Sequence, residues 1–155
     1  MVNDMSYIHN LPGTDFSSVP ATLIFFAALI YAAKQDIKTK EVGDYVHVII
    51  GTTAFLNFSW SNLPFMLFGA VISALPLFIM ALIKKGSVGG ADIKLMAACG
   101  LTLGANGGIT ALIIGLFLGV NGTYVYRKIK KADMKASFPL VPYLAAGCII
   151  ANFLK

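Results

Sequence analysis

Six apolar stretches, separated by short polar linkers, dominate the hydrophobic pattern of this chain. A helix needs about 20 mostly apolar residues to cross roughly 30 Å of hydrocarbon. Stretch 63–83 meets that length without a charged residue, whereas 91–104 is short for a full crossing. The pattern therefore predicts an all-α, polytopic membrane protein, a bundle of about six transmembrane helices. The predicted helices lie near residues 19–33, 45–60, 63–83, 91–104, 108–126 and 138–154.

Composition excludes an ordinary soluble domain. Of the 155 residues, 57% are hydrophobic and only 12% are charged, whereas charged residues make up about 25% of a typical soluble domain. A folded chain of this length buries only about 68–70% of its surface, so we expect a bilayer to solvate much of the remaining apolar surface. Cys99 and Cys148 lie inside apolar stretches, without the spacing of metal ligands, and are interpreted as packing residues.

Basic residues gather in alternate linkers, and this asymmetry predicts the orientation in the membrane. Cytoplasmic loops are enriched in Lys and Arg. We therefore expect residues 1–18, which carry neither, to form an extracytoplasmic N-terminal tail, residues 19–155 to form one membrane-embedded domain, and both termini to lie outside. The net charge of +5 then indicates contact with membrane lipids, and no nucleic-acid partner is expected. The basic residues of the predicted cytoplasmic side are Lys34, Lys38, Lys40, Lys84, Lys85, Lys94, Arg127, Lys128, Lys130, Lys131 and Lys135.

Two acidic residues lie where predicted helices meet basic loops. Asp36 follows the first apolar stretch and Asp92 begins the fourth, so the predicted topology brings both to the same membrane face. Carboxylates at membrane depth are costly and usually serve pairing, transport or catalysis, although an Asp at a helix end can also cap backbone N–H groups or pair with a nearby Lys. Asp44 directly follows Gly43 and precedes the second stretch, a position typical of such a cap. His47 lies about one helical turn after Asp44 and is expected to pack between helices or at the membrane–water interface.

The surroundings of the two aspartates resemble motifs of the aspartic prepilin peptidase family, which also includes the preflagellin peptidases. The family's first motif is similar to D-x-x-T-x-x-I-P-[ND]; this chain reads DIKTKEVGD from Asp36, with Thr39 retained and Gly43 in the place of the proline. The second motif is G-x-G-D followed by V/I-K-L; this chain reads GGADIKL, with Ala91 in the place of the second glycine. A weaker third match, FPLVPYLAAG, contains Pro142 and is similar to the proline-containing opening of the family's last helix.

The resemblance implies an activity and a set of site residues. It implies a GxGD-type aspartic endopeptidase that cleaves the short leader peptide from type IV pilin-like or flagellin-like precursors at the cytoplasmic face of the cell membrane. Asp36 and Asp92 would be its catalytic pair, in which one carboxyl keeps a proton while the other is charged. Neither a metal nor a cofactor is implied, because the chain lacks the paired CxxC motifs of larger, methyltransferase-containing members. The supporting motif positions are Gly89, Gly90, Ala91, Lys94, Thr39 and Pro142.

Two other interpretations use the same acidic residues. In a small transporter, Asp36 and Asp92 would bind a cation; in a non-catalytic membrane scaffold, they would be structural. Their place at the cytoplasmic edge, with no visible internal repeat, argues against transport.

The pattern Gly115-x-x-x-Gly119 favours close packing within the chain over dimerisation. The oligomeric state, the identity of the precursor, the bacterial or archaeal host, and the assignment of acid and base within the pair stay open.

Overall fold

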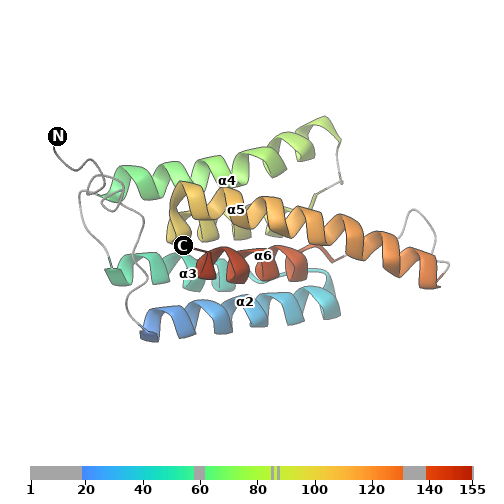
Figure 1. The fold of residues 1–155 in the computed structure, drawn as a ribbon, viewed down its shortest axis with the longest axis horizontal. Coiled ribbons are helices and arrows are strands. Elements are labelled where there is room, and N and C mark those ends of the chain that lie inside the picture. The colour runs from blue at the N-terminus through green and yellow to red at the C-terminus, as the bar shows by residue number, and fades with distance from the viewer. Residues whose placement is uncertain (1–18, 58–61, 85, 87, 131–138, 155) are drawn as a thin grey trace, which may run out of the picture.

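Helices make up all the regular secondary structure that the computed structural model describes, over residues 19–57, 62–84, 86, 88–130 and 139–154 (Figure 1). The predicted all-α class is therefore confirmed. The predicted tail, residues 1–18, lies outside the described residues. In chain order the elements are α2 (Val19–Thr39), α3 (Asp44–Thr53), the 3-10 helix η1 (Ala54–Asn57), α4 (Leu63–Ile83), α5 (Gly90–Lys130) and α6 (Val141–Phe153).

Local sequence explains several helix boundaries. Proline is the second residue of α2, α4 and α6, where it costs no hydrogen bond because the N–H it lacks would have no partner within the helix. Helix α3 begins after Gly43, whose backbone is extended, and gives way to η1 after Thr53. The Thr53 hydroxyl donates to the Ile50 carbonyl at 2.6 Å, and such back-bonding competes with the regular helical pattern.

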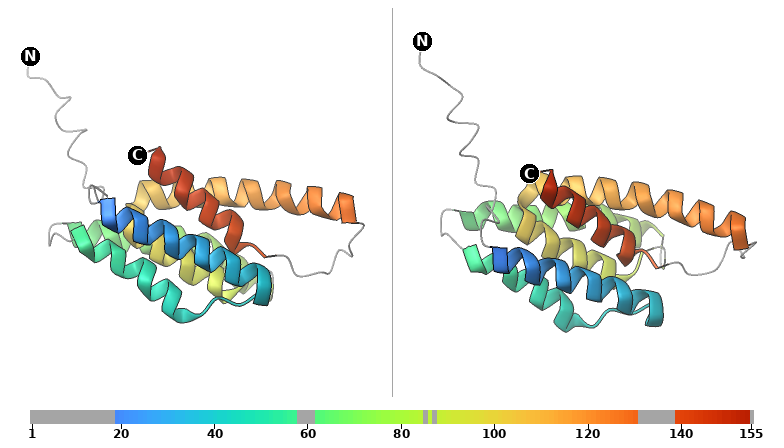
Figure 2. Two further views of the ribbon diagram at one scale, coloured as in Figure 1. Left: turned by 90° about the horizontal axis from the view of Figure 1, so that it is seen from below. Right: turned by 60° about the horizontal axis from the view of Figure 1, so that its bottom comes forward.

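Helix α5 consists of two arms that meet at Gly104. This residue has φ 72° and ψ −178°, a conformation essentially restricted to glycine. A Cβ built on Gly108 would lie 3.1 Å from the Cα of Gly100, although residues eight apart in a straight helix are separated by about 12 Å along the axis. The chain therefore folds back at Gly104, and both views of Figure 2 show residues 90–103 and 105–130 running in opposite directions. The predicted linker, residues 105–107, is itself helical.

The two arms of α5 occupy the centre of the fold. Helix α5 contacts α3, α4 and α6, and α2 packs against α3 and α6. Small residues let these backbones approach closely: a Cβ on Gly69 of α4 would come within 2.5 Å of the Gly100 carbonyl oxygen. A Cβ on Gly115 or Gly119 would likewise press against Leu144 or Leu140. The Gly115-x-x-x-Gly119 pattern therefore serves packing between α5 and α6, as predicted.

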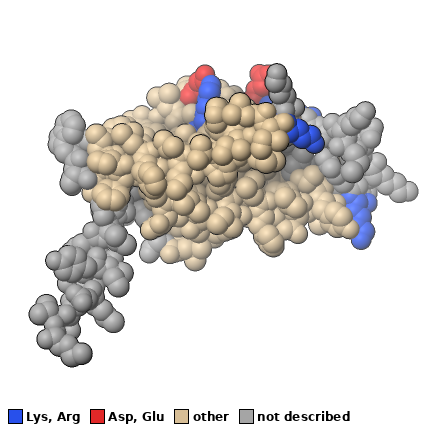
Figure 3. All heavy atoms as spheres, turned by 90° about the horizontal axis from the view of Figure 1, so that it is seen from above, with Lys and Arg blue, Asp and Glu red and all other residues tan. Residues whose placement is uncertain are grey.

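The outer surface is rich in large apolar side chains. Among the described helices, α4 and residues Gly90–Tyr126 of α5 are long and apolar enough, by length and composition, to cross a membrane. Only 22% of the apolar 18-residue stretch of α4 is buried, so most of this helix does not pack in a protein core. Charged side chains lie along one edge and at one end of the face in Figure 3, and the rest of the described surface there carries none. Cys99 and Cys148 are both buried, which confirms their prediction as packing residues.

Candidate active site

Asp36 lies in the last turn of α2 and is almost fully buried, with 6% of its surface exposed. Its Oδ2 accepts a hydrogen bond from the backbone N–H of Val141 at 3.3 Å. Val141 is the first residue of α6, and the first N–H groups of a helix have no partner within it. The positive end of the α6 dipole therefore meets the Asp36 carboxylate. Through this bond the end of α2 is tied to the beginning of α6.

Asp92 is the third residue of α5 and is 7% exposed. Its Oδ2 accepts a hydrogen bond from the Gly89 N–H at 3.1 Å, and its own N–H donates to the Gly89 carbonyl at 3.1 Å. Its other carboxylate oxygen, Oδ1, is buried and has no hydrogen-bond partner among the residues that the structure describes. A buried, unpaired carboxylate oxygen is costly, and such groups in native structures often mark function.

The end of α2, which carries Asp36, and the beginning of α5, which carries Asp92, lie at the same end of the bundle, on the right in Figure 1. The charge of Asp36 acts on Asp92, as a smaller influence than the burial of Asp92 itself. Two carboxyl groups that share a desolvated site cannot both ionise cheaply, so such pairs hold one proton between them. The arrangement can therefore supply one proton donor and one proton acceptor at the same place.

The turn between α2 and α3 is shaped by residues on both sides of it. Thr39 ends α2, and its hydroxyl lies 3.0 Å from the Gln35 carbonyl and 2.8 Å from the Glu41 carbonyl. Lys40 then adopts φ 55°, the left-handed conformation that commonly ends a helix. The Gly43 N–H donates to Gln35 Oε1 at 3.4 Å. A proline here, as in the family pattern, would lack that donor.

Lys94 and Asp44 form an exposed ion pair, with Lys94 Nζ 2.6 Å from Asp44 Oδ1. Lys94, a predicted support residue, thus points to α3 and pairs with Asp44. The prediction that Asp44 caps α3 is wrong: Gly43 occupies the cap position, and Asp44 is the first residue of the helix. The capping rule considers local sequence alone, whereas the Lys94 ammonium on a neighbouring helix competes for the carboxylate. This cation also lowers the pKa of the Asp44 carboxyl, which is fully exposed to solvent.

The predicted motif residues around Asp92 have different surroundings. A Cβ on Gly89 would lie 3.1 Å from Asp92 Oδ2, whereas a Cβ on Gly90 would have no neighbour within 4 Å. The Ala91 carbonyl lies 3.1 Å from Nε2 of His47. Pro142 occupies the first turn of α6, directly after the residue whose N–H binds Asp36.

Three contacts of the site could not be read from the motifs. The sequence pointed to the proline-containing block around Pro142, but not to the Val141 N–H as the partner of Asp36. Gln35 carries no signal beyond its place one residue before Asp36. His47 was recognised as a packing residue, and its hydrogen bond to the residue before Asp92 depends on the approach of α3 to α5.

Comparison with known proteins assigns the chain to a family. The sequence profile of the type IV leader peptidase family matches residues 23–123, which include both aspartates. The chain belongs to the type IV leader peptidase family. A relative from Bacillus subtilis (strain 168), named prepilin leader peptidase/N-methyltransferase, is 36% identical over 89 residues. The match covers 55% of this chain but only 34% of the relative, so the chain spans about a third of that protein. No solved structure matches the chain.

Membership of the type IV leader peptidase family supports two general statements. The chain is a member of a peptidase family, and its apolar helices, α4 above all, agree with a membrane protein. Within the described residues of this family member, no group of three or more His, Cys, Asp or Glu side chains could hold a metal ion.

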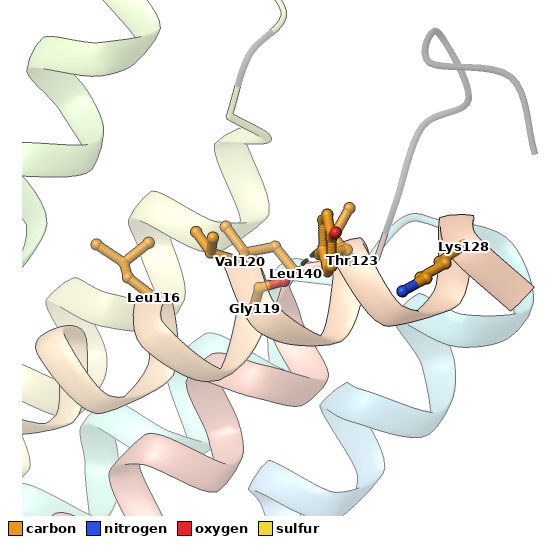
Figure 4. Close-up of a pocket in the computed structure, with 7 residues that line it drawn as sticks. Leu116, Gly119, Val120, Thr123, Lys128 and Leu140 are labelled. Atoms are coloured by element: carbon orange, nitrogen blue, oxygen red, sulfur yellow. Dashed lines mark hydrogen bonds between the residues drawn. The ribbon is translucent and has the colours of Figure 1, made fainter.

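A separate apolar groove of about 660 Å³ lies along the second arm of α5 (Figure 4). Neither Asp36 nor Asp92 lines it. Leu140, which precedes Val141, forms one part of its wall, and Lys128 lies toward one end. The groove is therefore distinct from the carboxylate pair. Its lining residues are Leu116, Gly119, Val120, Thr123, Tyr124, Lys128 and Leu140.

Proposed function

We propose that this chain is a membrane aspartic endopeptidase that removes the short leader from type IV pilin-like or flagellin-like precursors. Asp36 and Asp92 are its catalytic residues, and it acts at the cytoplasmic face of the cell membrane. The observation that carries this proposal is the meeting of two buried carboxylates at one end of the bundle, within the segment that matches the family. The family match does not favour a transporter or a scaffold.

The chemistry follows from a pair of carboxyls that holds one proton. The ionised carboxylate takes a proton from water, and the water oxygen attacks the carbonyl carbon of the scissile peptide bond. The protonated carboxyl donates a hydrogen bond to the oxygen on which negative charge develops. Protonation of the leaving amine then completes cleavage. No metal or cofactor takes part in these steps.

The immediate surroundings of the pair support this role. The Val141 N–H holds one oxygen of Asp36, and the Gly89 N–H holds one oxygen of Asp92. The other oxygen of Asp92 has no partner within the described part of the chain and can bind water or a proton. The sequence GGAD acts here as the counterpart of G-x-G-D, with Gly89 at the position where space beside the carboxylate is tightest.

The proposed topology places the site at the cytoplasmic face. Lys38 and Lys40 flank the end of α2, and Lys94 lies in the first turns of α5. These cations stand at the same end of the bundle as the two aspartates, and cytoplasmic loops are enriched in them. About six membrane crossings with both termini outside would satisfy this arrangement. A precursor with a leader at this face and an apolar helix in the bilayer would present its junction to the pair.

Cleavage of a candidate precursor, followed by the gel shift that accompanies loss of its leader, tests the proposal. Asp36→Asn and Asp92→Asn are near-isosteric and remove the acid–base function, so we expect each to lower the cleavage rate by about 10²-fold or more. Asp44→Asn is the matched control, because Asp44 is exposed and its one ion pair among the described residues is with Lys94; it should cleave at the wild-type rate. Cleavage that survives in either of the first two variants, at equal membrane abundance, would remove that aspartate from catalysis.

A further inference from the structure

His47 is a buried polar residue to which the proposed reaction assigns no task. It lies in the second turn of α3, with 7% of its surface exposed. Its Nε2 atom is 3.1 Å from the backbone carbonyl oxygen of Ala91, the residue directly before Asp92. A carbonyl oxygen can only accept, so Nε2 carries the hydrogen and donates it. The bond thus runs from α3 to the first turn of α5.

The first turn of α5 is held by apolar packing as well as by hydrogen bonds. Val88 and Ala91 are partly buried and pack against the core cluster, whereas a Cβ on Gly90 would meet no atom of the described residues within 4 Å. The Asp92 carboxylate is bonded to the Gly89 N–H, a group of the same turn. The place of this carboxylate relative to Asp36 therefore depends on contacts that reach the turn from other helices.

Helix α3 is itself joined to the helix that carries Asp36. The Gly43 N–H donates to Gln35 Oε1 at 3.4 Å, and the hydroxyl groups of Tyr31 and Tyr45 lie 2.9 Å apart. The beginning of α3 thus connects α2 to α5. The exposed Lys94–Asp44 pair joins α3 and α5 at the surface, where an ion pair contributes little. The His47 bond is partly buried, so water competes with it less than with the exposed ion pair.

We infer that His47 is a positioning residue for the peptidase reaction. By holding the Ala91 carbonyl, His47 fixes the first turn of α5 and keeps the Asp92 carboxylate in its position relative to Asp36. It touches neither substrate nor the reacting atoms. This inference rests on the proposed function, and it adds a third helix, α3, to the two that carry the aspartates.

Two substitutions separate this role from simple packing. His47→Leu places an apolar side chain in the buried position but removes the N–H donor. His47→Gln keeps an N–H donor at a similar reach. Thr52→Val is the control on the same helix, because the Thr52 side chain is exposed and donates to the Val48 carbonyl of its own helix. All three variants are compared with the full chain in lipid, at equal abundance.

We expect His47→Leu to lower kcat, with little change in KM, because displacement of a catalytic group by about 1 Å can cost about 10²-fold in rate. His47→Gln should recover most of the loss, and Thr52→Val should behave as wild type. Wild-type kcat in His47→Leu would overturn the inference. Equal loss in the Leu and Gln variants would also overturn it, since the donor would then not be the feature that matters.

Hydrogen exchange tests the same inference without cleavage. The backbone amides of residues 89–93 should exchange faster in His47→Leu than in wild type, and His47→Gln should restore their protection. Unchanged exchange in His47→Leu would contradict the inference even if no precursor were cleaved. A wild-type chain that does not cleave its precursor, but whose amides respond as expected, would count against the proposed function alone.

Discussion

Gly89 and Gly90 both precede Asp92, a catalytic residue of the proposed reaction, yet the structure predicts different outcomes when each is changed to alanine. A Cβ on Gly89 would lie 3.1 Å from Asp92 Oδ2 and 3.9 Å from its Cγ. Ordinary van der Waals contact begins near 3.4 Å, so the carboxylate has to move by about 0.3 Å. A Cβ on Gly90 would have no neighbour within 4 Å. Gly90→Ala is therefore the matched control for Gly89→Ala.

The expected loss of rate follows from this displacement. If a misplacement of about 1 Å costs about 10²-fold, a shift of about 0.3 Å costs about fourfold on a logarithmic scale. The N–H of residue 89 is retained in the alanine variant, so the hydrogen bond to Asp92 can still form. We thus expect Gly89→Ala to cleave about four times more slowly than wild type, and Gly90→Ala to cleave at the wild-type rate.

Initial rates of leader removal by purified protein in lipid, at several precursor concentrations, would measure both values. The loss should lie in kcat, because the moving group is the carboxylate and not a surface that binds the precursor. Equal rates for the two alanine variants would refute the reasoning. A slow Gly90→Ala variant would instead show that the freedom of the chain before α5, and not the space beside Asp92, limits the reaction.

Two further predictions concern parts of the fold outside the pair. Gly104→Ala places a side chain at φ 72° and ψ −178°, so we expect it to lower the free energy of unfolding by about 1–3 kcal/mol. Thermal unfolding in detergent measures the loss of stability. An unchanged unfolding midpoint would contradict the assigned backbone conformation. Val120→Trp fills part of the groove on the second arm of α5. Because neither aspartate lines the groove, we expect unchanged kcat and KM, and a raised KM would indicate that the precursor uses it.

The apolar pattern predicted where the helices lie better than where they end. The stretches ending near 33 and 104 correspond to the apolar part of α2 and to the first arm of α5. The second stretch was predicted to continue to 60, but regular α-helix ends at Thr53. The hydrogen bonds of Thr52 and Thr53 to carbonyls of their own helix accompany this end, a local competition that hydropathy does not register.

The candidate site could be predicted only in part. The positive-inside rule predicts that Asp36 and Asp92 lie on one face of the membrane, because it assigns both of their helix ends to the same side. The Val141 N–H, however, comes from a helix that begins more than one hundred residues after Asp36. Its role depends on how α2 and α6 pack, which no local motif specifies. The same holds for His47, whose partner is set by the approach of α3 to α5.

The location of the carboxylates at helix ends has a physical reason that connects the site to the fold. In a membrane, a buried carboxylate needs donors, and the backbone of a regular helix interior has none to offer. Helix beginnings do, because their first N–H groups are free. Asp36 uses the beginning of α6, and Asp92 uses the turn before α5. Each aspartate is thus held by the backbone at a helix start, so any substitution that shifts those starts should alter the distance between the carboxylates before it alters the fold.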